Sequence, residues 1–256
     1  MDFESIIYEK EEAIATIKLN RPKVLNALNQ QLWLEFHAAL DDARSDPAVK
    51  IVIITGEGRA FSTGADLKES KSITLENYRE HLVEAQETSR KLIRFEKPTI
   101  AAINGYALGS GCELALACDI RIAAQDAHIG SPVAKIESSV TGGAIRLIQD
   151  LIGPAKAREF LFTGEYIDGK EAARIGLVNT VVAPDRLMTA AKEMAGKIAE
   201  KSAFSIKIMK KGLLLASGGV SLEGLMDYEV EASLACASVK QEHKDKKDLE
   251  ERKKAQ

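Results

Sequence analysis

Apolar and polar positions repeat with two different periods along this chain. Two short alternating runs on either side of a charged turn predict a hairpin over residues 5–19. Continuous apolar runs predict three strands that are buried on both faces, at 51–55, 99–103 and 119–124. Helical spacing predicts one helix after Asn29, whose side chain can cap it, and a charged helix over 74–94. Because strand, loop and helix recur, the pattern predicts an α/β fold built by crossover connections.

From Gly142 onward the helical period dominates. Helices are expected at 142–151, 154–162, 169–175, 184–201, 204–217 and 221–237, with one strand at 178–182. The final segment, QEHKDKKDLEERKKAQ, is nearly all charge and is either a solvated helix or a frayed tail. The boundary between the α/β core and the helical part is expected between 188 and 203, which gives a core over 1–195 and a C-terminal helical region over 196–256.

Composition limits the class of protein. The 256 residues carry a net charge of −3 and give a pI near 5.9, so no basic field favours a nucleic acid partner. The N-terminus is acidic where a signal peptide is basic, and no uncharged run approaches the ~20 residues of a membrane span, so a cytoplasmic protein without a membrane partner is expected. The three cysteines and four histidines match no metal-ligand spacing, and neither a metal site nor a disulfide is expected.

Two short segments rich in small residues carry the candidate chemistry. In FSTGAD (61–66), Gly64 permits a backbone conformation closed to other residues, and Ala65 and Asp66 begin a predicted helix. In YALGSGCELALACD (106–119), three small residues lead from a strand into a second helix start. Backbone N–H groups at such helix starts have no internal partner, so the two turns together could hold one oxygen that gains negative charge.

The second segment places Glu113 inside an otherwise apolar run. An apolar setting raises the pKa of a carboxyl group toward the range that is useful for proton transfer. The alternative is a first-turn carboxylate that only favours the helix dipole. A dinucleotide-binding fingerprint is rejected because Leu114 stands where its third glycine belongs.

Four segments in this order resemble the crotonase family, also called the enoyl-CoA hydratase/isomerase superfamily. They are RPKVLNAL (21–28), GRAFSTGADL (58–67), KPTIAAINGYALGSGCELALACDIRIA (97–123) and IGPAKAREFLFTGEYIDGKEAARIGLVNTVV (152–182). The resemblance covers almost the whole chain. It implies a crotonase-like spiral of ββα units, followed by a helical C-terminal region through which three copies form a trimer, with trimers often paired into hexamers.

The resemblance also implies the chemistry. The substrate is an acyl-CoA thioester, no further cofactor is needed, and the N–H groups of Ala65 and Ser110 hold the carbonyl oxygen of the thioester while an enolate forms. Glu113 matches the first catalytic glutamate of the family. The positions that match substrate or CoA contacts are Lys23, Val24, Leu25, Thr63, Asp66, Leu67, Lys68, Gly109, Val133 and Gly142.

This chain departs from the family at the second catalytic acid. The hydratases carry a glutamate directly after a proline, whereas the residue after Pro132 here is Val133. Glu137, four residues on, is the one replacement that the segment offers. Hydration or isomerisation of an enoyl-CoA is the expected activity. The alternatives are hydrolysis, decarboxylation or carbon–carbon cleavage by the same enolate, and a non-catalytic acyl-CoA-binding protein.

Overall fold

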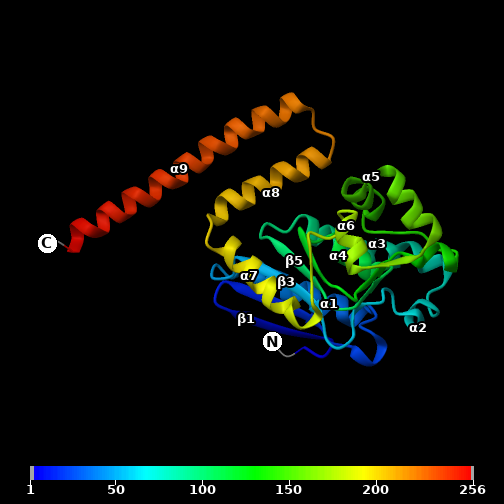
Figure 1. Cartoon of the computed structure of the whole chain (residues 1–256). Coiled ribbons are helices and arrows are strands. Elements are labelled where there is room, and N and C mark those ends of the chain that lie inside the picture. The colour runs from blue at the N-terminus through cyan, green and yellow to red at the C-terminus, as the bar shows by residue number, and fades with distance from the viewer. Residues whose placement is uncertain (1–2, 255–256) are drawn as a thin grey trace. The chain divides into compact units, whose positions relative to one another are not determined.

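The computed structural model describes the backbone of residues 3–254 and the side chains of all of these except residues 243 and 246–254. The described chain forms two compact units that divide between Glu200 and Lys201 (Figure 1). No helix among the described residues is long and apolar enough to span a membrane.

The first unit is built on a six-stranded sheet of order β1-β2-β3-β5-β7-β10. Its strands are β1 (Ile6–Glu11), β2 (Ile14–Leu19), β3 (Ile51–Gly56), β5 (Thr99–Ile103), β7 (Ile120–Ala124) and β10 (Thr180–Val182). Only the β1–β2 hairpin is antiparallel; the other neighbours are parallel. The predicted hairpin, the three buried strands and the late strand are all confirmed.

Helices cover both faces of this sheet. Those of the first unit are α1 (Gln30–Ser45), α2 (Leu67–Ser70), α3 (Leu75–Ile93), α4 (Ser110–Leu116), α5 (Ala144–Thr163), α6 (Gly169–Arg174) and α7 (Leu187–Ala199), with 3-10 turns η1 (Pro22–Val24), η2 (Pro132–Ile136) and η3 (Pro184–Arg186). Asn29 caps α1 as predicted, because its side chain accepts a hydrogen bond from the N–H of Leu32 at 3.1 Å. The two helices predicted at 142–151 and 154–162 are the halves of α5, which bends at Gly153 before Pro154.

Alternate residues of the central strands divide the core between these two layers. In β3, Val52 and Ile54 pack with α1, α3, α4 and α5, whereas Ile51 and Ile53 pack with α7. Figure 1 shows α7, in yellow, lying across the strands. All six residues of β3 are buried, which explains why its sequence contains no charged residue and does not alternate between polar and apolar.

A second sheet of four short strands was not predicted. Its order is β4 (Ala60–Ser62), β6 (Tyr106–Leu108), β8 (His128–Gly130) and β9 (Tyr166–Asp168). None of the strands predicted from the sequence covers 60–62 or 106–108. Each strand has only three residues, which is too short for any period to show. The parallel pairing of β4 with β6 brings the two turns that follow these strands to the same edge of the sheet.

The second unit consists of α8 (Ala203–Ser217) and α9 (Leu222–Lys254). The Tyr228 hydroxyl of α9 donates to the Ile208 carbonyl oxygen of α8 at 2.7 Å, and the Tyr228 ring lies over Gly212. Both helices are confirmed, but α9 is longer than the predicted 221–237 because it continues through most of the charged segment. A charged helix without an apolar stripe carries no periodic signal. Residues 255–256 lie outside the described part.

Candidate functional site

The two turns rich in small residues lie backbone against backbone. A Cβ atom added to Gly64 would lie 2.7 Å from the Leu108 carbonyl oxygen and 3.0 Å from the Ser110 nitrogen. A Cβ atom added to Gly111 would lie 2.2 Å from the Ser62 carbonyl oxygen. Gly64 also has φ +91°, which side chains other than hydrogen rarely allow. Glycine at 64 and 111 is therefore what allows the two helix starts to approach each other.

The N–H of Ala65 is left free by the way its segment pairs. The Leu28 N–H donates to the Gly64 carbonyl oxygen at 2.8 Å, and the Asp66 N–H donates to the Leu28 carbonyl oxygen at 3.0 Å. In this parallel bridge the middle residue, Ala65, directs its own N–H and carbonyl to the opposite side. Within the described residues, no acceptor occupies this N–H.

The N–H of Ser110 is free for a different reason. Ser110 is the first residue of α4, so its N–H has no acceptor one turn earlier in the helix. Gly109 before it takes φ +53°, which turns the chain sharply out of β6. Among the described residues nothing accepts from this N–H either. The structure thus places two unpaired donors on adjoining turns.

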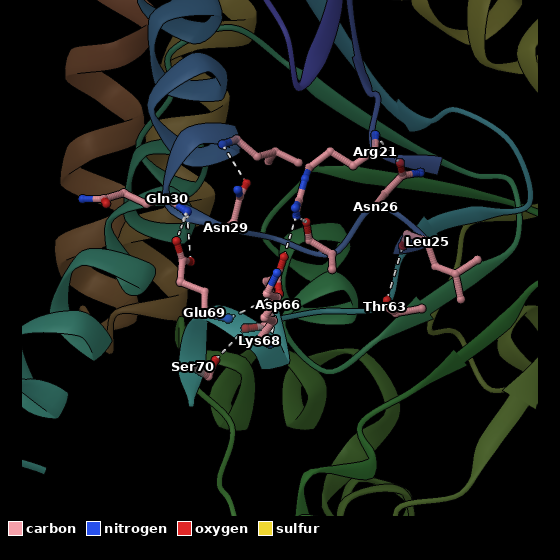
Figure 2. A network of polar contacts seen from close by, with 12 residues as sticks. Arg21, Leu25, Asn26, Asn29, Gln30, Thr63, Asp66, Lys68, Glu69 and Ser70 are labelled. Carbon is pink, nitrogen blue, oxygen red and sulfur yellow. Dashed lines mark hydrogen bonds and ion pairs between the residues drawn. The ribbon is translucent and has the colours of Figure 1, made fainter. Parts of the chain in front are cut away.

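A partly buried ion pair supports the first of these turns (Figure 2). Arg21 Nη1 lies 2.9 Å from Asp66 Oδ2 and also donates to the Ala27 carbonyl oxygen. The other carboxylate oxygen of Asp66 accepts from the N–H groups of Lys68 and Glu69 and so caps α2. Burial alone would raise the pKa of Asp66, but the hydrogen bonds from Arg21 and from the two N–H groups bring that pKa below its usual value. Asp66 therefore stays ionised and fixes the residue beside Ala65.

Replacing Arg21 with methionine is expected to lower the free energy of unfolding by about 1–3 kcal/mol, because it leaves a poorly solvated carboxylate without its partner. The matched control is Arg174→Met, since Arg174 pairs with Glu171 on the open surface of α6, where an ion pair contributes little to stability. Chemical denaturation of both variants measures the difference. Equal losses in the two variants would contradict a structural role for the Arg21–Asp66 pair.

Glu113 lies one turn into α4, on the inner side of the helix. It is only 5% exposed, and both of its carboxylate oxygens accept hydrogen bonds from Thr141: Oε1 from the N–H at 3.1 Å and Oε2 from the hydroxyl at 2.6 Å. Burial raises the pKa of Glu113, and the two hydrogen bonds partly oppose that rise. The raised pKa that the apolar run predicted is confirmed in direction.

A cavity of about 960 Å³ opens between α2, α3, α5 and the loop that contains Glu137 and Thr141. It is lined by Ala65, Leu67, Ser70, Tyr78, Leu82, Gln86, Ile136, Glu137, Ser138, Ser139, Val140, Thr141, Gly143, Ala144, Ile145 and Arg146. Three residues singled out from the sequence, Ala65, Leu67 and Glu137, are on this wall. Gly142 lies behind it, where an added Cβ would meet Ser89 Oγ at 2.4 Å and Glu113 Oε2 at 4.0 Å.

The other candidate binding residues surround the first turn. Lys23 and Val24 are exposed on η1, and the N–H of Thr63 donates to the Leu25 carbonyl oxygen at 3.1 Å. Lys68 is exposed on α2, and neither lysine forms an ion pair within the described part of the chain. Their contacts with CoA remain predictions.

The segment 133–141 contains the hydrogen-bond partner of Glu113, Thr141, and the apolar residue Val133. Val133 is half-buried in the first turn of η2, so it offers an apolar side chain where the family has its second acid. Thr141 was not predicted as part of the site. It stands in the loop between η2 and α5, where no helical or strand period marks a residue whose partner is 28 positions away.

Comparison with known proteins places this geometry in a family. The family model described as enoyl-CoA hydratase/isomerase matches residues 9–255. A crotonyl-CoA hydratase from Syntrophomonas wolfei is 42% identical over 211 residues, which are 82% of this chain and 81% of that protein. A short-chain-enoyl-CoA hydratase from Clostridium acetobutylicum is 39% identical over 83% of this chain and 82% of its own length.

Solved structures agree with the sequence comparison. The crystal structure of an enoyl-CoA hydratase from Bacillus anthracis superposes with a TM-score of 0.87 at 33% identity and covers 90% of each chain. Matches of this extent, in both sequence and fold, show that this chain is an enzyme-family member and belongs to the enoyl-CoA hydratase/isomerase family.

Proposed function

We propose that the protein hydrates short 2-enoyl-CoA thioesters. The observation that carries this proposal is the pair of unpaired N–H groups, those of Ala65 and Ser110, on adjoining turns with the Glu113 carboxylate one helical turn away. Two relatives named crotonyl-CoA hydratase and short-chain-enoyl-CoA hydratase support the same substrate class.

The proposed reaction assigns one task to each group. Glu113 in its ionised form takes a proton from water as the water oxygen adds to the β-carbon of the conjugated thioester. Negative charge then collects on the thioester oxygen, where the Ala65 and Ser110 N–H groups hold it. The enolate then takes a proton at its α-carbon, either from a second carboxylic acid or from the Glu113 carboxyl group that has just received one, and becomes the 3-hydroxyacyl-CoA. Losing one such donor typically lowers the rate by about 10²–10³-fold.

We propose no cofactor beyond the CoA of the substrate. The residues around η1 and α2, including Lys23 and Lys68, would contact this CoA.

Glu137 is the proposed source of the second carboxylate. Its N–H donates to the Val133 carbonyl oxygen at the end of η2, in a left-handed conformation with φ +54°, and its exposed side chain lines the same cavity as Ala65 and Thr141. Replacing Glu137 with glutamine is expected to lower kcat for crotonyl-CoA by about 10-fold or more, since general acid–base groups contribute at least that much. Glu165→Gln, on the exposed pair with Lys135, is the matched control. A Glu137 variant as fast as the wild type would leave both proton transfers to Glu113.

The test of the proposed function follows the absorbance of crotonyl-CoA as its conjugated double bond is lost. Turnover that is abolished in Glu113→Gln supports hydration, and binding without turnover contradicts it. The second candidate activity is migration of the double bond, because a single carboxylate can move a proton between two carbons and Val133 in η2 supplies no second carboxylate. Conversion of a 3-enoyl-CoA, without hydration of crotonyl-CoA, would show that activity.

We further propose that copies of the chain associate through the second unit. Large apolar side chains stand exposed on both of its helices, among them Met209 and Leu213 on α8 and Met226, Val230 and Leu234 on α9. Exposed apolar area of this kind marks an interface in a soluble protein. Light scattering is expected to give three or six times the chain mass of 27.8 kDa. A monomer at micromolar concentration would contradict this proposal.

A further inference from the structure

One residue, Thr141, supplies both hydrogen bonds that the Glu113 carboxylate accepts within the described chain. The main-chain N–H reaches Oε1 at 3.1 Å and the side-chain hydroxyl reaches Oε2 at 2.6 Å. Two donors on one residue fix both the position and the rotation of the carboxylate plane. A group with both oxygens held in this way cannot turn without breaking a charge-assisted hydrogen bond.

These donors also select a protonation state. A carboxylate accepts on both oxygens, whereas a neutral carboxylic acid must use one oxygen as a donor. The Thr141 hydroxyl oxygen can accept that proton only after the hydroxyl turns its own hydrogen away, and the charge-assisted hydrogen bond to Glu113 is then lost. Burial acts in the opposite sense, because the low-dielectric setting favours the neutral acid. Thr141 is therefore the group that opposes the loss of charge at Glu113.

No charged neighbour duplicates this effect. On the same helix, the Cys112 thiol has its pKa raised to about 12 by burial and by the charge of Glu113, so it is neutral. The strands β4 and β6 carry no acidic or basic residue, and the buried positions of α3 are Thr88, Ser89 and Leu92. The charged residues that line the adjoining cavity are Glu137, which is exposed, and Arg146, which pairs with Asp150 at 2.7 Å.

We infer that Thr141 is a positioning residue that holds the Glu113 carboxylate in one orientation and keeps it ionised for use as a base. The inference rests on the proposed function only in naming Glu113 as the base of the reaction.

The first test uses stability and needs no activity. The free energy of unfolding is measured against pH for the wild type, Thr141→Val, Glu113→Gln and the double variant, with Thr189→Val on the exposed surface of α7 as the matched control. Valine keeps the shape of threonine and removes the hydroxyl. Because the hydroxyl stabilises the ionised form of Glu113, the loss caused by Thr141→Val is expected to grow as pH rises through the titration of Glu113 and to become independent of pH in the Glu113→Gln background. A loss that is the same at every pH in both backgrounds overturns the inference.

The second test uses the pH profile of kcat/KM for crotonyl-CoA. Thr141→Val is expected to move the acidic limb to higher pH and to lower kcat/KM on the order of 10-fold on that limb, because a hydrogen bond to a charged group is lost. Thr141→Ser keeps both donors and is expected to restore the limb. Equal profiles for the serine and valine variants overturn the inference. A wild type that does not act on crotonyl-CoA would instead overturn the proposed function, and the stability cycle would still decide the role of Thr141.

Discussion

Replacing Glu113 with glutamine is expected to lower kcat for crotonyl-CoA by about 10²–10⁴-fold, the range typical of a lost general acid–base group. Glutamine has the same shape, and its amide can still accept from the Thr141 N–H and donate to the Thr141 hydroxyl oxygen, so the site should keep its packing. The measurement is the loss of absorbance of the conjugated thioester. Activity within a few-fold of the wild type would remove Glu113 from the mechanism.

The same variant makes a prediction about stability whose sign follows from the raised pKa of Glu113. An acid whose pKa is higher in the folded state holds its proton more tightly there, so its neutral form adds stability at low pH and that stability is lost as pH rises through the folded-state pKa. As pH rises from the usual glutamate pKa to the raised pKa of Glu113, the free energy of unfolding of the wild type should therefore fall relative to that of Glu113→Gln. Unfolding curves at several pH values check this, and a parallel pH dependence of the two proteins would contradict it.

Replacing Gly64 with alanine is expected to have the second large effect. The new Cβ would lie 2.7 Å from the Leu108 carbonyl oxygen and 3.0 Å from the Ser110 nitrogen, on a residue with φ +91°. Strain and overpacking together should lower the free energy of unfolding by about 2–4 kcal/mol. Because the clash is with Ser110 itself, kcat should fall by about 10²-fold or more even in the folded fraction.

Two other glycines distinguish backbone strain from overpacking as the cause of the losses expected in Gly64→Ala. Gly109 has φ +53° with no atom within 4 Å of an added Cβ, so the stability of Gly109→Ala measures backbone strain without overpacking. Gly196 lies inside α7 with open space around it, and Gly196→Ala should stabilise the protein by about 0.5–1 kcal/mol. Denaturation and turnover of the three variants are compared. Loss of stability in Gly109→Ala equal to that in Gly64→Ala would assign the effect to strain and not to the contact between the turns.

The sequence predicted the centre of the large sheet because its central strands, β3, β5 and β7, are buried on both faces. Runs such as those in β3 and β5 contain no charged residue that interrupts the signal, and the Asn29 cap marked the start of α1. The second sheet escaped because three residues are too few to show alternation. These short strands nevertheless decide how the turn after Ser62 meets the turn after Leu108.

The candidate site was likewise predictable only in part from the sequence. Glu113 was found because a charge inside an apolar run is conspicuous, and Ala65 and Ser110 were found because glycines mark the turns beside them. Thr141 and the Arg21–Asp66 pair were missed as supports, since each depends on a contact between segments far apart along the chain. A hydrogen bond or ion pair between residues far apart along the chain leaves no periodic sequence pattern in either segment.

Because the N–H groups of Ala65 and Ser110 belong to the main chain, their chemical capacity does not depend on which side chains these two positions carry. A saturation mutagenesis survey should therefore tolerate many amino acids at 65 and 110 and very few at 64 and 111, although the glycines offer no group to a substrate. Laboratory evolution of substrate preference can accordingly begin at the donor positions themselves.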